Sequence, residues 1–299
     1  MKTILITGGT GLIGKYLSVL LRSKGYKVTV LSRSNSEAPN SYYWNIEGKF
    51  IEAEAIKEAD YIIHLAGAGI ADERWTKNRK KELIDSRVDS TKLLYENVLK
   101  LNPHIKGFIA ASGIGYYGAT TSEKIFTEND EIGTDFIASI CKLWENESLK
   151  FDAINIRTVI LRTGIVLAAN GGAYQKMSKP IKLGIGSVLG NGKQYVPWIH
   201  IKDLCNMYIS AIENENIHGI YNAVSPEHTT NEVLTKNIAL SLNKKIILPN
   251  TPGFVLKTLL GKMAEILLEG SRVSAEKILA TGFNFEYPTL KSALKNLLK

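Results

Sequence analysis

The stretch ILITGGTGLIG, Ile4 to Gly14, runs from an apolar, β-branched segment through evenly spaced glycines into a helix-like segment. Gly8, Gly11 and Gly14 stand between the first predicted strand and the first predicted helix. In such a turn one glycine permits the tight bend, another lets a pyrophosphate approach the backbone, and another lets helix and strand pack closely. The helix N-terminus adds N–H donors and a positive dipole. The stretch therefore predicts a dinucleotide site in preference to a structural turn.

Further apolar runs follow along the chain, with helix-like segments between them. They are KVTVLS, DYIIHLA, GFIAAS and INIRTVILR. Repetition of strand, helix and strand predicts a parallel sheet that is covered on both faces. The predicted fold class is therefore α/β, a Rossmann-like doubly wound parallel sheet with a smaller, mainly helical C-terminal substrate region.

The same pattern divides the chain into three parts. Residues 1–165 form the predicted dinucleotide-binding domain, to which a segment of about 198–224 returns. Residues 166–197 and 225–248 predict loops and helices of a substrate region, because long, glycine-rich segments in a compact domain are usually functional. Residues 249–299 have the pattern of three short helices with a Gly/Phe/Pro break and predict a small helical C-terminal domain.

Composition narrows the class of protein. The 299 residues are 44% apolar and 22% charged, as in an ordinary globular protein. Cys141 and Cys205 are too few and too far apart for a disulfide framework or a zinc site, so we expect a reducing compartment and no metal. We expect a cytoplasmic protein without a membrane partner, because the sequence has neither a secretory signal nor an apolar run of spanning length. The formal charge of +8 is interleaved with acids, which favours an anionic small-molecule ligand over nucleic acid.

Several motifs carry a resemblance to a known superfamily. The spacing Gly-x-x-Gly-x-x-Gly, preceded by Thr7, resembles that of the extended and atypical short-chain dehydrogenases/reductases, and HLAGAGI, ASGIGYYG, PWIHIKDL and GIYNAVSP resemble its landmarks in order. More narrowly, HLAGAGIADERW, DSRVDST, LRTGIVLAANGGAY and LLEGSRVSAEKILATGFNFEYP resemble the NAD(P)-dependent epimerase/dehydratase family that ends in a small helical C-terminal domain of unknown function. The resemblance covers essentially the whole chain. It implies a fold and a cofactor more than a substrate, although such proteins are commonly labelled sugar-nucleotide epimerases.

The end of the second predicted strand bears on the choice of cofactor. An NAD-preferring site would place Asp or Glu there to bond the ribose hydroxyls, but this strand ends in VLSRS. A carboxylate would repel a 2′-phosphate, whereas Arg33 would attract it, with Ser32 and Ser34 as added donors. NADP is therefore the predicted cofactor, with NAD less favoured. Alternatively, Arg33 is a solvated residue at a strand end.

The other predicted cofactor residues surround these two segments. Ala66 and Gly67 end the strand DYIIHLA, where small residues let the chain pass close to the adenosine and ribose. His64 has apolar neighbours on both sides, and we interpret it as a hydrogen-bonded core histidine. The full predicted set is Gly8, Thr10, Gly11, Leu12, Ile13, Gly14, Ser32, Arg33, Leu65, Ala66, Gly67 and Arg87.

The proton-transfer residues that the resemblance implies are incomplete. Members of the superfamily use a serine and a Tyr-x-x-x-Lys pair, but four residues before Lys142 stands Ala138, which has no phenol. Lys142 could still bond the nicotinamide ribose, or it could be a solvated helical lysine. Ser112 falls at or one position from the implied catalytic serine. Either Tyr116 or Tyr117, with Tyr117 as our candidate, could supply the phenol from another direction or could simply pack under a loop.

Basic and aromatic residues on the segment before and within the next helix suggest an anionic substrate. Arg87 stands where many extended members have an asparagine that holds a water relay, and a guanidinium would instead bind an anion or carboxylate. Arg74, Trp75 and Arg79 could join it, although nearby acids also permit a salt-bridged helix face. His200 is a further substrate candidate because histidine titrates near neutral pH.

Two functions from different classes are consistent with these residues. One is an NADP-binding, epimerase-like oxidoreductase that acts on a nucleotide sugar or another anionic small molecule, with the cofactor carrying the hydride. The other is a dinucleotide-binding sensor or regulatory protein that has lost turnover, which Ala138 favours. We expect a monomer or homodimer in either case.

Overall fold

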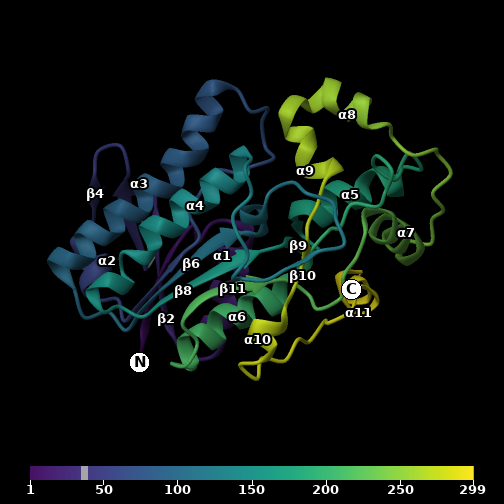
Figure 1. The fold of residues 1–299 in the computed structure, drawn as a ribbon. Coiled ribbons are helices and arrows are strands. Elements are labelled where there is room, and N and C mark those ends of the chain that lie inside the picture. Colours follow the sequence, from purple (N-terminus) through teal and green to yellow (C-terminus); the bar gives the residue numbers. More distant parts are fainter. Residues whose placement is uncertain (35–39, 299) are drawn as a thin grey trace.

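The computed structural model, which describes residues 1–34 and 40–298, is built around a sheet of eight strands (Figure 1). The strand order is β11-β8-β6-β5-β1-β2-β3-β4, and neighbours are parallel except in the β3-β4 pair. These strands are β1 (Thr3–Thr7), β2 (Lys27–Ser32), β3 (Ser41–Asn45), β4 (Phe50–Ile51), β5 (Tyr61–His64), β6 (Gly107–Gly113), β8 (Thr158–Thr163) and β11 (Gly219–Ala223). The predicted doubly wound parallel sheet is confirmed.

Helices cover both faces of this sheet, which is why its strands are apolar on both sides. Along β1, Ile4 and Ile6 enter the cluster that contains α1 and α6, whereas Leu5 enters the cluster that contains α2 and α3. The helices are α1 (Leu12–Ser23), α2 (Ala53–Lys57), α3 (Lys77–Leu101), α4 (Phe136–Leu149), which packs beside α3, and α6 (Ile201–Glu213). Figure 1 shows α3 and α4 on one face and α6 on the other.

A third apolar cluster forms beyond the sheet, around the fully buried Trp198. It joins α5 (Gly172–Lys182), α7 (Asn231–Ser241) and α11 (Leu290–Leu297). Two small parallel pairs lie outside the main sheet: β9 (Ile165–Ala168) with β10 (Trp198–His200), and β7 (Ile125–Phe126) with β12 (Arg272–Val273). The short elements are η1 (Ile114–Tyr117), η2 (Asp152–Ile154), η3 (Gly261–Ala264), α8 (Gly253–Leu260), α9 (Glu265–Leu268) and α10 (Glu276–Leu279).

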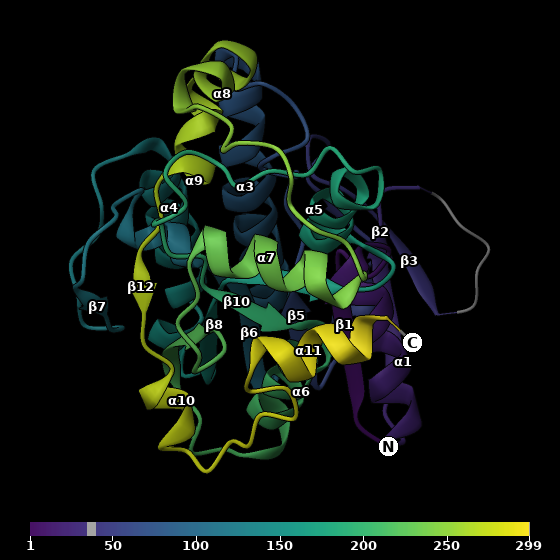
Figure 2. The same ribbon diagram turned by 90° about the vertical axis from the view of Figure 1, so that its right-hand side faces the viewer.

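The C-terminal segment wraps over the earlier parts of the chain (Figure 2). Its buried side chains join shared clusters: Ile278 of α10 packs with the sheet, and Leu294 of α11 packs with α5 and α7. Thus residues 249–298 are mainly helical, as expected, while several of their apolar side chains are buried against the rest of the protein. The predicted domain boundaries stay a prediction.

The described residues contain neither a membrane-spanning helix nor a metal-binding cluster. In residues 1–34 and 40–298 no helix combines the length and apolarity needed to cross a bilayer. The same residues hold no cluster of three or more His, Cys, Asp or Glu side chains placed to bind a metal ion. Cys141 and Cys205 are buried free thiols.

Candidate functional site

The carboxyl ends of the three central strands meet at one edge of the sheet. Thr7, the last residue of β1, is in register with Leu31 of β2 and His64 of β5. Gly8, Ser32 and Leu65 each follow one of these residues. The fold therefore brings together the three segments that the sequence assigned to the cofactor, at the edge where open parallel sheets bind ligands.

The glycine turn is shaped differently at each of its three positions. Gly8 has φ of +69°, which an L side chain rarely adopts. A Cβ on Gly14 would lie 2.4 Å from the carbonyl oxygen of Gly8, so this position holds helix α1 against the turn. A Cβ on Gly11 would meet only that same oxygen, at 3.2 Å, and would otherwise enter open space. Gly11 is thus the position at which a bound group can approach the backbone.

A pocket of about 340 Å³ lies over this turn. Its lining includes six predicted cofactor residues: Gly8, Gly11, Leu12, Ile13, Gly14 and Leu65. The opposite wall comes from residues that sequence reasoning missed: Ile165, Val166, Gly172 and Ala173. The signal for this wall was the GlyGly pair before α5, since Gly172 has φ of +66° and a Cβ there would lie 2.9 Å from the Leu12 side chain. The pocket has the open glycine face and the helix N-terminus that a dinucleotide requires.

His64 secures the strand ends beneath the pocket. The hydroxyl of Thr7 accepts hydrogen bonds from the N–H groups of Leu65 and Ala66, each at 3.2 Å, and donates to Nδ1 of His64 at 2.7 Å. Nε2 of His64 then donates to the Thr91 hydroxyl at 3.0 Å. Burial lowers the pKa of His64 to about 3, with a smaller effect from the charge of Arg87. The interpretation of His64 as a hydrogen-bonded core histidine is confirmed.

Arg33 and Ser32 lie at the same edge, one strand away. The Ser32 hydroxyl is 2.9 Å from that of Ser34 and accepts a hydrogen bond from the Ser34 N–H at 3.2 Å. Arg33 is exposed and forms neither a hydrogen bond nor an ion pair with the residues that the structure describes. Thr10 is exposed within the glycine turn, which the Gly11 N–H closes by donating to the Gly8 carbonyl at 3.0 Å.

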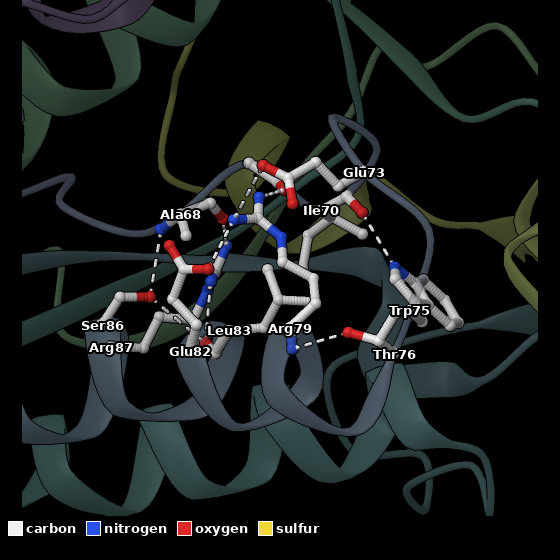
Figure 3. Close-up of polar contacts among 11 residues, drawn as sticks. Ala68, Ile70, Glu73, Trp75, Thr76, Arg79, Glu82, Leu83, Ser86 and Arg87 are labelled. Atoms are coloured by element: carbon white, nitrogen blue, oxygen red, sulfur yellow. Dashed lines mark hydrogen bonds and ion pairs between the residues drawn. The ribbon is translucent and has the colours of Figure 1, made fainter.

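Side chains of α3 hold the loop that follows β5 (Figure 3). The Arg79 guanidinium donates to the Gly69 carbonyl and to Glu82, both at 2.7 Å. The Ser86 hydroxyl accepts from the Ala68 N–H at 3.1 Å, and Arg87 donates to the Ala68 carbonyl at 2.9 Å. Arg79 is therefore engaged by its own helix and loop.

Arg87 is a buried cation for which the described residues supply no carboxylate partner. It is 8% exposed, and its second hydrogen bond goes to the Leu83 carbonyl at 2.9 Å. No carboxylate pairs with it anywhere in the described ranges. A Cβ on Gly67 would lie 3.0 Å from the guanidinium carbon of Arg87, so the Arg87 charge lies directly against the loop that follows β5. Burial lowers the pKa of Arg87 to about 10, which still leaves it cationic at neutral pH.

The other two residues of the proposed anion site lie farther along the loop. Trp75 donates its ring N–H to the Ile70 carbonyl at 2.9 Å, and its ring packs edge-on against Phe136, with centroids 5.4 Å apart. Arg74 is exposed and lies against η3, because a Cβ on Gly261 would be 3.3 Å from a guanidinium nitrogen. Arg74 therefore stands where the loop meets the C-terminal segment.

Ser112 belongs to a buried polar network. Its hydroxyl donates to Glu145 of α4 at 2.7 Å, and Glu145 forms two 2.9 Å hydrogen bonds with the guanidinium of Arg162 on β8. Since the serine proton is given to a carboxylate, Ser112 can only accept a hydrogen bond from a ligand. Sequence reasoning missed this ion pair, although Arg162, which ends the apolar run INIRTVILR, signals a buried acidic partner.

The two tyrosines after β6 have different surroundings. Tyr117 is 2% exposed; its hydroxyl donates to Asn222 at 2.6 Å and accepts from Arg162 at 3.1 Å. Burial raises the pKa of Tyr117 to about 12. Tyr116 is half-buried, its ring lies 3.4 Å from the Arg162 guanidinium, and its hydroxyl forms no hydrogen bond with the described residues. These contacts favour a structural role for Tyr117, whose part in proton transfer stays a prediction.

The face of α4 that meets the end of β6 does not carry the expected lysine. A Cβ on Gly115 would lie 2.3 Å from the Ile137 side chain, and one on Gly113 would lie 3.7 Å from the sulfur of Cys141. Ile137 and Cys141 thus occupy this face, four residues apart. Lys142 is exposed, one position further round the helix. Burial raises the pKa of the Cys141 thiol to about 12, so it is not a proton donor of ordinary strength.

His200 lies beneath the C-terminal segment instead of in the pocket lining. It is 1% exposed and caps α6, because its Nδ1 accepts from the Lys202 N–H at 3.2 Å. Its ring packs against Tyr287, with centroids 4.0 Å apart. Burial lowers the pKa of His200 to about 4. The predicted substrate role of His200 therefore has no support from its position.

The fold, the glycine turn and its pocket define a dinucleotide-binding protein of the short-chain dehydrogenase/reductase type. Comparison with known families gives the narrower class. The chain belongs to the NAD dependent epimerase/dehydratase family, whose model matches residues 4–223. Residues 251–297 match a domain of unknown function, DUF1731. The resemblance noted in the sequence is thereby confirmed.

Relatives match the chain over its full length. It is 32% identical to the human epimerase family protein SDR39U1 over 99% of both chains. It is 35% identical to the Bacillus subtilis epimerase family protein YfhF, over 99% of this chain and 97% of the relative. A crystal structure of human SDR39U1 with NADPH superposes with a TM-score of 0.87 at 31% identity, covering 99% of this chain and 98% of that one. A Thermotoga maritima UDP-glucose 4-epimerase, at 19% identity and a TM-score of 0.76, shares the fold.

Proposed function

We propose that the protein binds NADP(H) at the glycine turn and acts as an epimerase-like oxidoreductase on an anionic small molecule. The observation that carries the proposal is the pocket, in which the bare backbone of Gly11 faces open space between α1 and α5. The human relative whose structure contains NADPH supports the choice of nicotinamide dinucleotide. When bound, such a cofactor supplies hydride transfer at its nicotinamide.

Different residues of the chain would contact different parts of the bound cofactor. The N–H groups at the start of α1 and the open face of Gly11 would hold the pyrophosphate. Arg33 would attract a 2′-phosphate, with Ser32 beside it. Leu65, Ala66 and Gly67 would line the adenosine and ribose side, while Ile165 and Ala173 line the pocket opposite the turn.

Arg87 is the group that favours an anionic substrate. Its charge has no carboxylate partner within the described residues and stands behind Gly67, so an approaching phosphate or carboxylate would be attracted there. Tyr116 is the phenol best placed to exchange a proton, because its hydroxyl is not held by any described residue. Ser112 would orient a substrate by accepting a hydrogen bond.

Turnover tests this proposal. The protein would be incubated with NADPH and a panel of nucleotide sugars and carbonyl compounds, with cofactor absorbance and sugar NMR as readouts. We expect conversion of at least one substrate, and its loss in the Gly11→Ala variant. Conversion that persists in Gly11→Ala would contradict the proposal.

A second candidate is a dinucleotide-binding sensor. It is favoured by α4, where Ala138 stands in place of the tyrosine and where Ile137 and Cys141 face the segment that follows β6. For a sensor we expect tight cofactor binding without conversion of any panel member, together with a change in protease sensitivity when the cofactor binds.

A further inference from the structure

Two stretches of the sequence contain basic residues and no acid. Neither Asp nor Glu stands between Asp152 and Asp203, or between Glu232 and Glu265. Helix α5 lies in the first stretch, and the segment that joins α7 to α8 lies in the second. Elsewhere in the chain acidic residues stand among the basic ones, whereas these two segments carry positive charges alone.

The two stretches lie side by side in the fold. The Thr251 N–H donates to the Val188 carbonyl at 2.8 Å, and the Gly190 N–H donates to the Thr251 carbonyl at 2.9 Å. Ile246 packs against the cluster that contains Ile181 of α5. Figures 1 and 2 both show the chain between α7 and α8 running past α5. The segment after α7 therefore extends the outer surface of α5.

Large aliphatic side chains are exposed on both of these adjoining segments. Ile247 is 80% exposed, Leu183 67%, Ile185 61% and Leu248 44%. Exposed lysines accompany them on the same segments. We call this surface the cationic apolar face, made of Lys179, Lys182, Leu183, Ile185, Lys244, Lys245, Ile247 and Leu248.

The lysines of this face have no ion-pair partner among the residues that the structure describes. Among the ion pairs of the described residues, none includes Lys179, Lys182, Lys244 or Lys245. Two acids near this face already have partners. Asp72 pairs with Lys176 at 3.6 Å, and Glu232 pairs with Lys236 at 2.5 Å.

We propose that the cationic apolar face binds the surface of anionic lipid membranes. Aliphatic side chains can enter the boundary between headgroups and acyl chains, while lysine stems lie along apolar surface and hold their ammonium groups at the lipid phosphates. Such a peripheral contact needs no spanning helix. It differs from the expectation of no membrane partner, which rested on the lack of a span.

Charge and composition argue against other occupants. A second copy of the chain bound through the same patch would place lysine against lysine. Single-stranded nucleic acid is bound by stacking on aromatic rings, whereas the apolar members of this face are aliphatic. Protein interfaces are enriched in Trp, Tyr and Arg and depleted of Lys, the opposite of this composition.

Vesicle flotation of the full-length protein tests the proposal. Vesicles of phosphatidylcholine would be compared with vesicles containing about a third phosphatidylglycerol, at low and high salt. We expect binding to the anionic vesicles that is at least about tenfold tighter than to neutral ones and weaker at high salt. The double variant Ile247→Asp/Leu248→Asp should lose at least about tenfold of this binding.

Val19→Asp is the matched control, because Val19 is 65% exposed on α1, outside this face. It should bind vesicles like the wild type. NADPH titration and thermal unfolding check that each variant is folded. Absence of binding to anionic vesicles, or full binding by the Ile247→Asp/Leu248→Asp variant, would overturn the proposal. So would capture of polyglutamate through this face without vesicle binding, which would indicate an acidic protein partner.

Discussion

Removing the carboxylate of Glu145 should destabilise the protein strongly. The side chains of Glu145 and Arg162 are 3% and 2% exposed, and two hydrogen bonds of 2.9 Å join them. Burial by itself would lower the pKa of Arg162, but the hydrogen bonds and charge of Glu145 outweigh it and raise that pKa. Glu145→Gln therefore leaves a cation that stays charged without its counter-charge, which costs about 3 to 5 kcal/mol.

The assay is urea unfolding, with thermal unfolding as a second readout. For a chain of 299 residues this loss corresponds to a fall in Tm of about 5 to 8 °C. Glu145→Leu/Arg162→Met removes both charges and should be less destabilised than Glu145→Gln, because no buried charge remains unpaired. If Glu145→Gln unfolds within about 1 kcal/mol of the wild type, or if the double variant is destabilised as much as Glu145→Gln, the reasoning is wrong.

Three further predictions concern the pocket, the phenols and pH. Gly11→Ala should weaken NADPH binding at least about tenfold and cost about 1 kcal/mol or less of stability, because the added Cβ fills open space at the start of α1. Isothermal titration measures the change in affinity, and urea unfolding measures the change in stability. Tyr116→Phe should lower turnover and leave cofactor affinity unchanged. Tyr117→Phe should instead cost about 1 to 3 kcal/mol of stability, because Asn222 and Arg162 lose a buried hydrogen-bond partner. Equal effects of the two variants on turnover would refute this assignment. Between pH 6.5 and about 4, His200 binds a proton in the unfolded chain but not in the folded protein, so the free energy of unfolding falls as pH falls. The variant His200→Asn keeps an oxygen that can cap α6, and it should reduce the loss of stability between about pH 7.5 and 5.5 by about 1 kcal/mol. An unchanged loss, measured by urea unfolding at the two pH values, would count against the burial of His200.

Features set by short-range pattern could be predicted from the sequence. The strands and the turn at Gly8, Gly11 and Gly14 follow from local apolar runs and glycine spacing, and parallel pairing then brings Ser32 and Leu65 to the same edge. His64 was predictable because a polar group between apolar neighbours must find partners when buried.

Features that join distant segments could not be predicted in this way. The contact between Ser112 and Glu145 spans 33 residues, and that between Tyr117 and Asn222 spans 105. No local spacing encodes such pairs, so Ser112 was assigned to catalysis without the carboxylate that takes its proton. The far wall of the pocket was missed for the same reason, since Gly172 meets Leu12 through tertiary packing alone.

The central claim is that the glycine turn holds NADP(H), and paired titration with NADPH and NADH tests it most directly. Binding would be followed by quenching of tryptophan fluorescence and by energy transfer to the nicotinamide, in the wild type, Gly11→Ala and Arg33→Asp. We predict NADPH-selective binding that Gly11→Ala weakens for both nucleotides and Arg33→Asp weakens for NADPH alone. Failure to bind either nucleotide, or binding that Gly11→Ala leaves unchanged, would contradict the account.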